Sequence, residues 1–322
     1  MPAGGRCHTR AVLQGRARQT PTAAVAASNR RAAAAVVASA VLFGTTGTTQ
    51  ELGPDGITPY GLGAVRVLIG ALTLWVIVGH APRLGAVRGH RPALALGGFA
   101  VAVYQPGFFT GTARLGVALG TVVALGSAPV FAGLVEWAAG RPPAPRWRWA
   151  TLLAIAGGTL MVFSGAGGAS FNVVGLLGSL AAGLGYAVYA LTTRRLFGLG
   201  VDPTEATAWQ FSIGAVLLSP FYVTEPFDWL ATGSGVAAAL YLGVVVTGIA
   251  YLLYGWGLRT LEASTAATFT LAEPVTAGVL AVLVLDERLR WFGWAGAVLV
   301  LVGLTLAGGG ARARAVAAEP PY

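Results

Sequence analysis

The sequence contains no lysine, a single cysteine and only three histidines. A Walker-type phosphate-binding loop requires a lysine, so the chain has no ATP site of that kind. Cys7 has no second cysteine with which to form a disulfide, and His8, His80 and His90 do not form a ligand cluster with it. We therefore expect neither a disulfide framework, nor a metal, nor another cofactor.

Charge is scarce as well. Only 10% of the residues are charged, against about 25% in a typical soluble domain, while 55% are hydrophobic and the mean hydropathy is +0.70. Several long stretches carry no charge at all, and the clearest are 92–113, 149–193, 206–224, 229–258 and 291–311. Because a helix needs about 20 apolar residues to cross a bilayer core, these stretches predict an all-α integral membrane protein in contact with lipid.

Ten membrane-spanning helices are predicted, joined by short connections rich in Gly, Pro and Arg. Their expected positions are near 32–49, 60–79, 93–113, 115–137, 147–164, 174–193, 205–223, 236–257, 263–285 and 291–307. Residues 1–31 are basic, contain no acidic residue and lack the apolar core of a signal peptide, so we expect a disordered tail there. Residues 308–322 are expected to form a second tail.

The distribution of arginine predicts the orientation. If the N-terminus is inside, the inner segments carry 17 of the 21 arginines and the outer segments carry 3, with Arg66 inside a span. This is the bias of the positive-inside rule, and it places both termini in the cytoplasm of a multi-pass inner-membrane protein. The net charge of +9 then reflects topology. No nucleic-acid partner is expected, because the arginines lie in a tail and short loops.

The chain repeats itself at an offset of 145 residues. Pro129-Val130 aligns with Pro274-Val275, the Ala-Gly pair two positions later aligns too, and Trp149 aligns with Trp294. Two halves of five spans each are therefore predicted, over 32–164 and 174–307. Because five is odd, the second half enters the membrane in the opposite direction. Inverted repeats of this kind are typical of secondary transporters, whose site lies between the halves near the midplane.

Three stretches resemble a known family. "LAEPVTAGVLAVLVLDERL" (271–289), "YGLGAVRVLIGALTL" (60–74) and "LFGTTG" (42–47) are similar to hallmarks of the drug/metabolite transporter superfamily, specifically its EamA-type members. The resemblance covers about residues 32 to 307. It implies a secondary transporter, a monomer or homodimer, that moves a small metabolite outward, such as an amino acid or a related amphipathic compound.

The sequence departs from the family pattern at two places. Asp286 stands where the family usually has glycine before its closing acidic residue, which here is Glu287. The first half has no matching acidic residue after its fourth span. The role of this acidic residue is therefore either confined to the second half or not essential in the first half.

Glu273 lies near the middle of the ninth span and directly precedes Pro274. An ionised carboxylate at that depth costs about 2.5 kcal/mol or more unless it is paired or hydrated, and binding a proton lowers the cost. Glu273 is thus either a site for proton coupling or for a substrate amine, or a neutral acid that stabilises a kink. Pro274 and its counterpart Pro129 each remove a helix hydrogen bond, and each forms either a packing kink or a hinge.

The other candidate site residues are polar or aromatic and lie inside spans. Arg66 either reaches outward to water, Glu51 or Asp55, or faces a cavity as a partner for a carboxylate or phosphate. The remaining candidates lie too deep for an interfacial belt and are predicted to line a cavity: Tyr104, Gln105, Tyr186, Tyr189 and Tyr251. Glu136, at the inner end of the fourth span, is expected to contact loop arginines.

Other functions stay open at this stage. An antiporter of phosphorylated metabolites or nucleotide sugars predicts several cationic residues in the cavity. A non-transporting membrane scaffold or sensor predicts a large module outside the membrane, and the loops are short. An enzyme would need a nucleophile–base pair or a metal at depth, so we expect none. Transport would then draw on a gradient, for which protons are the candidate coupling ion.

Overall fold

A computed structural model describes residues 21–79, 88–115, 117–165, 172–284, 286 and 290–317 of the chain. The elements over these residues are helical. They are α1 (Pro21–Gly44), α2 (Thr46–Glu51), α3 (Pro59–Val78), η1 (Arg88–His90), α4 (Arg91–Leu115), α5 (Val117–Ala138), α6 (Pro145–Gly165), α7 (Val173–Gly198), α8 (Pro203–Leu217), α9 (Phe221–Thr224), η2 (Asp228–Ala231), α10 (Gly233–Leu240), η3 (Tyr241–Ile249), α11 (Ala250–Gly257), α12 (Ala263–Phe269), η4 (Thr270–Ala272), α13 (Glu273–Val284) and α14 (Trp291–Ala317).

Helices lie over each of the ten predicted ranges. Seven of the described helical segments are long and apolar enough to cross a membrane by length and composition: Ala27–Glu51, Pro59–Val78, Arg91–Leu115, Gly120–Ala138, Val173–Gly198, Gly233–Gly257 and Ala263–Val284. A shorter apolar segment covers Trp291–Ala307. The expectation of an all-α integral membrane protein is thus confirmed, and the full count of ten crossings stays a prediction.

The two predicted tails are shorter than expected within the described residues. Helix α1 begins at Pro21, inside the segment expected to be disordered, because 21–35 is rich in alanine, the best helix former. Helix α14 continues to Ala317, since the first proline beyond it is Pro320. Residues 1–20 and 318–322, which complete the predicted tails, lie outside the described residues.

Helix starts follow from local side chains. The Thr58 hydroxyl accepts from the Gly61 N–H at 3.3 Å, and Pro59 then occupies the first helical position of α3. Asp202 and Pro203 repeat this arrangement at α8, where the carboxylate accepts from Thr204 N–H at 2.9 Å. Asn172 caps α7 in the same way. These caps fix where each rod begins.

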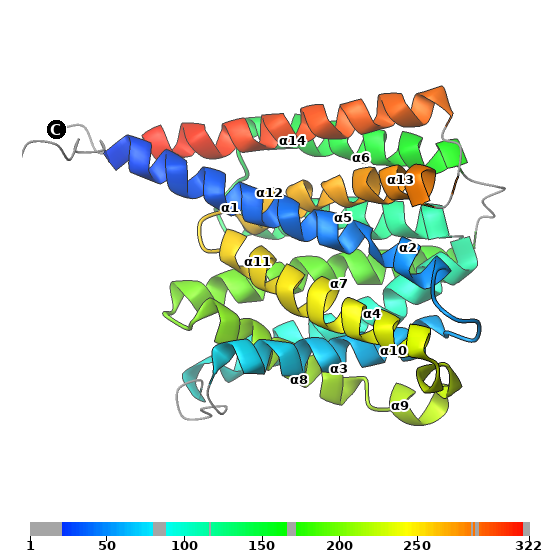
Figure 1. Ribbon diagram of the computed structural model, residues 1–322. Coiled ribbons are helices and arrows are strands. Elements are labelled where there is room, and N and C mark those ends of the chain that lie inside the picture. The colour runs from blue at the N-terminus through cyan, green and yellow to red at the C-terminus, as the bar shows by residue number, and fades with distance from the viewer. Residues whose placement is uncertain are drawn as a thin grey trace, which may run out of the picture.

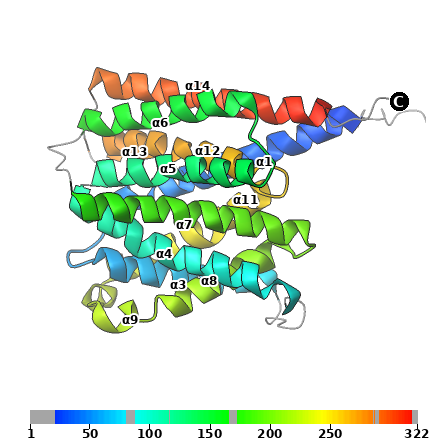
Figure 2. The ribbon, with the colours of Figure 1, turned by 180° about the vertical axis from the view of Figure 1, so that it is seen from behind.

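The rods form a bundle with two edges and a centre. Helices α6 and α14 lie side by side at one edge, and α3 and α8 lie at the other (Figures 1 and 2). The remaining long rods, α1, α4, α5, α7, α10–α11 and α12–α13, pack between them. In Figure 1 the chain enters α1 and leaves α14 at the left end, so both described ends lie at the same end of the bundle.

Glycine contacts show that the two halves pack alike. A methyl group on Gly98 would meet the Cβ of Ile213. In the other half, Gly243 corresponds to Gly98, and a methyl group on it would meet the Cβ of Ile69, which corresponds to Ile213. Likewise Gly214 faces the carbonyl of Gly98, while Gly70 faces the carbonyl of Gly243. These two close approaches of the α4–α8 pair therefore recur between η3 and α3.

Two rods depart from α-helical geometry at their centres. Residues Tyr241–Ile249 (η3) form a π-helix, whose turn holds more residues than an α-helical turn. Residues Thr270–Ala272 (η4) form a 3₁₀ turn directly before Glu273. Breaks of both types occur often at functional sites, and both of these lie beside the cavity described below.

Asp286 occupies the backbone conformation that glycine favours. Its φ angle is +54°, in the left-handed region, and it is the one described non-glycine residue with a positive φ. Asp is among the few residues that tolerate this region. The departure from the family pattern at this position therefore changes the side chain to one that tolerates this backbone conformation.

Candidate functional site

A central cavity of about 250 Å³ lies between the two halves of the bundle. Its wall is shared by the central rods, by the N-terminal half of α3 and by α2. Gln50, Pro59 and Ala113 line it, so it reaches the end of the bundle where α2 and α4 end and α3 begins, on the right in Figure 1. Six of the sequence-predicted residues lie on its wall: Arg66, Tyr104, Tyr186, Tyr251, Glu273 and Pro274.

Glu273 is carried into the cavity by a broken helix. Pro274 has no N–H to donate to the carbonyl of Thr270, one turn earlier, and the chain forms the 3₁₀ turn η4 between α12 and α13. The opposing wall is Gly44 at the end of α1, where a methyl group would lie 2.8 Å from the Glu273 carbonyl oxygen and 2.6 Å from the Thr276 Cβ. The absence of a side chain at Gly44 therefore lets α1 pack directly on the break.

Arg66 is buried in the wall, with an exposed fraction of 7%. One guanidinium Nη donates to the Gln105 side-chain oxygen at 3.0 Å, and the guanidinium carbon lies 5.8 Å from the centre of the Phe109 ring. Its Nε has no hydrogen-bond partner among the described residues. Arg66 therefore faces the cavity and does not reach Glu51 or Asp55, and Gln105 acts by holding it.

Arg66 and Glu273 place a guanidinium and a carboxyl group on the wall of the same cavity. Across the described residues, their charged atoms do not come within the 4.0 Å of an ion pair. A guanidinium has five N–H donors, and the Nε–H of Arg66 has no partner among the described residues, so the bond to the neutral Gln105 amide leaves donors for a ligand. The cavity thus presents one guanidinium and one carboxyl group, both with capacity to bind a ligand.

Aromatic side chains form much of the remaining wall. The Tyr104 and Tyr186 rings are 6.0 Å apart, and the Tyr251 ring packs on Phe43 at 4.9 Å. Tyr189 lies behind this wall, with its ring 5.5 Å from that of Tyr251. Together with Tyr254, which is fully buried, Tyr186 and Tyr189 close the floor of the cavity.

The two aligned prolines differ in effect. Pro274 lies on the cavity wall at an interrupted helix, as a hinge would. Pro129 is buried inside α5, which runs as one α-helix from Val117 to Ala138 and is not interrupted at the proline. The structure therefore distinguishes the two positions, which the sequence repeat had made equivalent.

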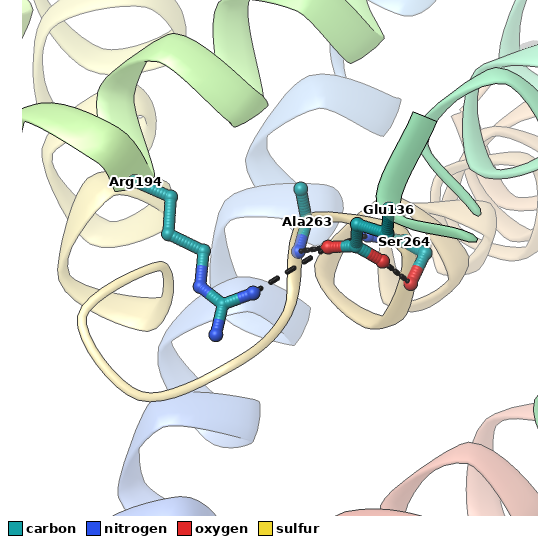
Figure 3. Close-up of polar contacts among 4 residues, drawn as sticks. All are labelled: Glu136, Arg194, Ala263 and Ser264. Carbon is teal, nitrogen blue, oxygen red and sulfur yellow. Dashed lines mark hydrogen bonds and ion pairs between the residues drawn. The ribbon is translucent and has the colours of Figure 1, made fainter. Parts of the chain in front are cut away.

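A polar cluster joins the rods at the other end of the bundle. Glu136 near the end of α5 accepts from the Ala263 N–H at 2.8 Å and from the Ser264 hydroxyl, both at the start of α12 (Figure 3). Arg194 on α7 reaches the same carboxylate at 3.5 Å. Glu136 does meet an arginine, as expected, and in addition it caps α12. We call this group the inner closure: Glu136, Arg194, Ala263 and Ser264.

A second cavity of about 950 Å³ lies beside the inner closure. We call it the arginine-lined cavity, because Arg141, Arg194, Arg195 and Arg259 are on its wall. Four rods line both cavities, namely α4, α5, α7 and the rod that ends with α11 and Leu258. The tyrosine floor and the inner closure separate the two spaces. Each of these rods thus extends from one space to the other.

Sequence reasoning missed part of the wall. Phe43, Gly44, Thr46 and Gly47 line the cavity, and all four belong to the "LFGTTG" stretch that had signalled the resemblance. That motif was the available signal. Thr247 in η3 also lines the cavity, and nothing in its sequence context distinguishes it from the other threonines of the spans.

The fold and the site define a multi-pass membrane protein with a charged, aromatic cavity between two repeats. The chain belongs to the EamA-like transporter family, whose model matches residues 30–164 and again residues 173–309. The family match thus covers both predicted repeats, and the protein is a membrane transporter.

Two relatives and one solved structure extend the comparison. "Uncharacterized transporter YwfM" of Bacillus subtilis (strain 168) is 39% identical over 268 residues, which is 83% of this chain and 90% of that protein. An "Uncharacterized transporter" of Archaeoglobus fulgidus is 25% identical over 269 residues, or 80% and 90%. A crystal structure superimposes with a TM-score of 0.73 at 21% identity, covering 85% of this chain and 96% of the other, which shows a shared fold.

Proposed function

We propose that this transporter carries a small zwitterionic metabolite, such as an amino acid, across the inner membrane by alternating access through ten spanning helices. The observation that supports the substrate class is that Arg66 and Glu273 both line the same cavity. The guanidinium suits a carboxylate, and the carboxylate suits an ammonium group. The surrounding tyrosines and phenylalanines suit an apolar side chain.

The size of the cavity supports a small cargo. Pockets for drug-sized ligands occupy about 300–1,000 Å³, and this cavity holds about 250 Å³. The charges also weigh against phosphorylated metabolites and nucleotide sugars. Arg66 is the one basic residue among the described lining residues, and Glu273 would oppose a second negative charge.

The arginine distribution suggests which state the structure represents. If the arginine-rich end is cytoplasmic, as the count of 17 inner against 3 outer arginines favours, the central cavity opens outward. The inner closure then shuts the cytoplasmic side. Opening inward requires that α5 and α7 release the start of α12 (Figure 3). Release of cargo to the outside would make the protein an exporter.

Glu273 is the proposed coupling residue. It lies on the cavity wall at a helix break. The free-energy cost of an ionised carboxylate in the membrane falls when the side chain binds either a proton or a cationic ligand. A carboxylate that exchanges one for the other links cargo movement to a proton gradient. The alternative, a purely structural acid at the kink, predicts no such linkage.

The test is counterflow in proteoliposomes with a panel of labelled amino acids, with and without an imposed pH gradient. Wild type is expected to accumulate label in response to the gradient. Glu273→Gln is expected to lose at least tenfold in gradient-driven rate, which corresponds to about 1.4 kcal/mol. Glu51→Gln, the same chemical change at an exposed residue near the cavity mouth, serves as the matched control.

The outcomes separate the two parts of the proposal. Uptake by Glu273→Gln at the wild-type rate and with the wild-type pH dependence would remove Glu273 from coupling. Failure of wild type to take up any zwitterion in the panel would remove the substrate class. The family assignment rests on the sequence match and stands in either case.

A further inference from the structure

The arginine-lined cavity has more positive charge than its own carboxylate can neutralise. Four arginines line it against one acid, Glu136, whose oxygens already accept from Ala263, Ser264 and Arg194. Three helices, α5, α7 and α11, also end there, and each C-terminus contributes about half a negative charge. The lining arginines outnumber the lining acid by three, and the three helix C-termini offset only part of this excess, which points to an anionic ligand.

The depth of this cavity matches the membrane surface. Trp137, one residue after Glu136, is 64% exposed on the outside of α5, and Trp149 at the same end of the bundle is 68% exposed. Tryptophan concentrates where bilayer headgroups meet the acyl chains. The cavity is therefore at the level of lipid phosphates.

The rest of the cavity wall is largely apolar, and several of its side chains are exposed. Leu96 of α4, Val135 of α5 and Leu199 after α7 all line it, with exposed fractions of 51%, 46% and 52%. Exposed apolar side chains beside a water-filled vestibule would be unfavourable, whereas an acyl chain would cover them. A soluble anion would satisfy the arginines but leave these side chains uncovered.

We propose that the arginine-lined cavity binds a phospholipid with a net negative headgroup, its phosphate against the arginines and an acyl chain against Leu96 and Val135. Basic pockets between spanning helices bind anionic headgroups in this way. Arg194 belongs both to this cavity and to the inner closure. A bound phosphate therefore competes with Glu136 for Arg194. Occupancy of the cavity by lipid would then change the stability of the inner closure.

Lipid binding can be measured by native mass spectrometry on the full chain, with phosphatidylglycerol and phosphatidylcholine as competing probes. Wild type is expected to retain phosphatidylglycerol preferentially. The variant Arg141→Gln/Arg195→Gln/Arg259→Gln, which leaves Arg194 in place, is expected to lose at least about tenfold of this preference. Each arginine near an anionic headgroup contributes about fivefold to the binding affinity. Because three arginines are removed, the tenfold loss is a lower bound.

Matched variants keep the test interpretable. Arg30→Gln/Arg146→Gln/Arg148→Gln removes the same charge from exposed residues at the same end that do not line the cavity, and it should keep the preference. Lysine at positions 141, 195 and 259 should restore most of it. Equal loss in both glutamine triples would overturn the proposal. So would displacement of the lipid by equimolar glycerol phosphate, since that outcome assigns the cavity to a soluble anion.

Discussion

Arg66 owes its position to a neutral partner. The Gln105 side chain accepts one guanidinium hydrogen bond at 3.0 Å without cancelling the charge, so the cation stays available to the cavity. A carboxylate at position 105 would instead form an ion pair with the guanidinium and cancel its charge. The choice of amide over acid at this position thus keeps Arg66 free for a ligand.

Gln105→Glu is therefore expected to weaken binding of a zwitterionic substrate by about tenfold or more, because hydrogen bonds to charged groups are worth about 1.5–3 kcal/mol. Equilibrium binding to purified protein measures the change. Gln105→Met keeps the volume and adds no charge, so its effect should be clearly smaller. Equal affinities for the Glu and Met variants would show that Arg66 does not bind the carboxylate.

Among elements, α1 and the break before α13 pack closely at the cavity wall. Gly44→Ala would place a methyl group 2.8 Å from the Glu273 carbonyl, which forces the two rods apart. The expected loss is about 1–3 kcal/mol of stability, as for other overpacked sites. It would appear as a lower unfolding temperature of the purified protein.

Gly47→Ala is the natural control for Gly44→Ala. Gly47 lies three positions on, lines the same cavity and has nothing within 4 Å of an added methyl group. The same exchange there should leave stability unchanged or slightly raise it, because alanine favours a helix over glycine. If both variants unfold at the same temperature, the close packing of α1 on the break is not important for stability.

The backbone at Asp286, beyond the end of α13, allows a second prediction at this scale. Asp286 has a φ of +54°, a region that costs most L-residues about 1–2 kcal/mol. Asp286→Val should lower the unfolding temperature, whereas Asp286→Gly should not. Thermal unfolding monitored by tryptophan fluorescence would distinguish the two, and a stable Val variant would contradict a left-handed conformation here.

At the scale of the whole molecule, topology can be tested with single cysteines. In a Cys7→Ser background, Gly47→Cys lies on the central cavity and Ala139→Cys lies on the arginine-lined cavity. With an impermeant maleimide on intact cells, we expect labelling of Gly47→Cys and not of Ala139→Cys. Permeabilised cells should label both. Labelling of Ala139→Cys alone in intact cells would reverse the proposed orientation.

The sequence predicted the positions of the rods because charge-free length and Arg-rich connections depend on local composition alone. It also predicted a cavity for residues that do line one, since polar groups at membrane depth are costly and conspicuous: Arg66, Tyr104, Tyr186, Tyr251 and Glu273. Gln105 and Tyr189, predicted with them, are not on the wall of the central cavity. The sequence could not predict that Arg66 would be held by Gln105, or that Glu136 would cap α12. Those contacts join residues 39 and 127 positions apart and depend on how the rods pack.

The repeat also made Pro129 and Pro274 equivalent, and packing made them different. Pro129 is enclosed within a continuous α5, whereas Pro274 follows a 3₁₀ turn at the cavity wall. A match between two sequence segments cannot show such a difference, because it depends on the residues that pack around each proline in the folded protein. Similarly, no pattern in 241–249 announces the π-helix.

The position before each proline has a further consequence. The 145-residue offset that aligns the prolines sets Ala128 opposite Glu273, so a frame with two nearly equivalent halves holds its acid in one half alone. A ligand with two unlike ends can then lie in the cavity only one way up, since the inverted pose would bring like charges together.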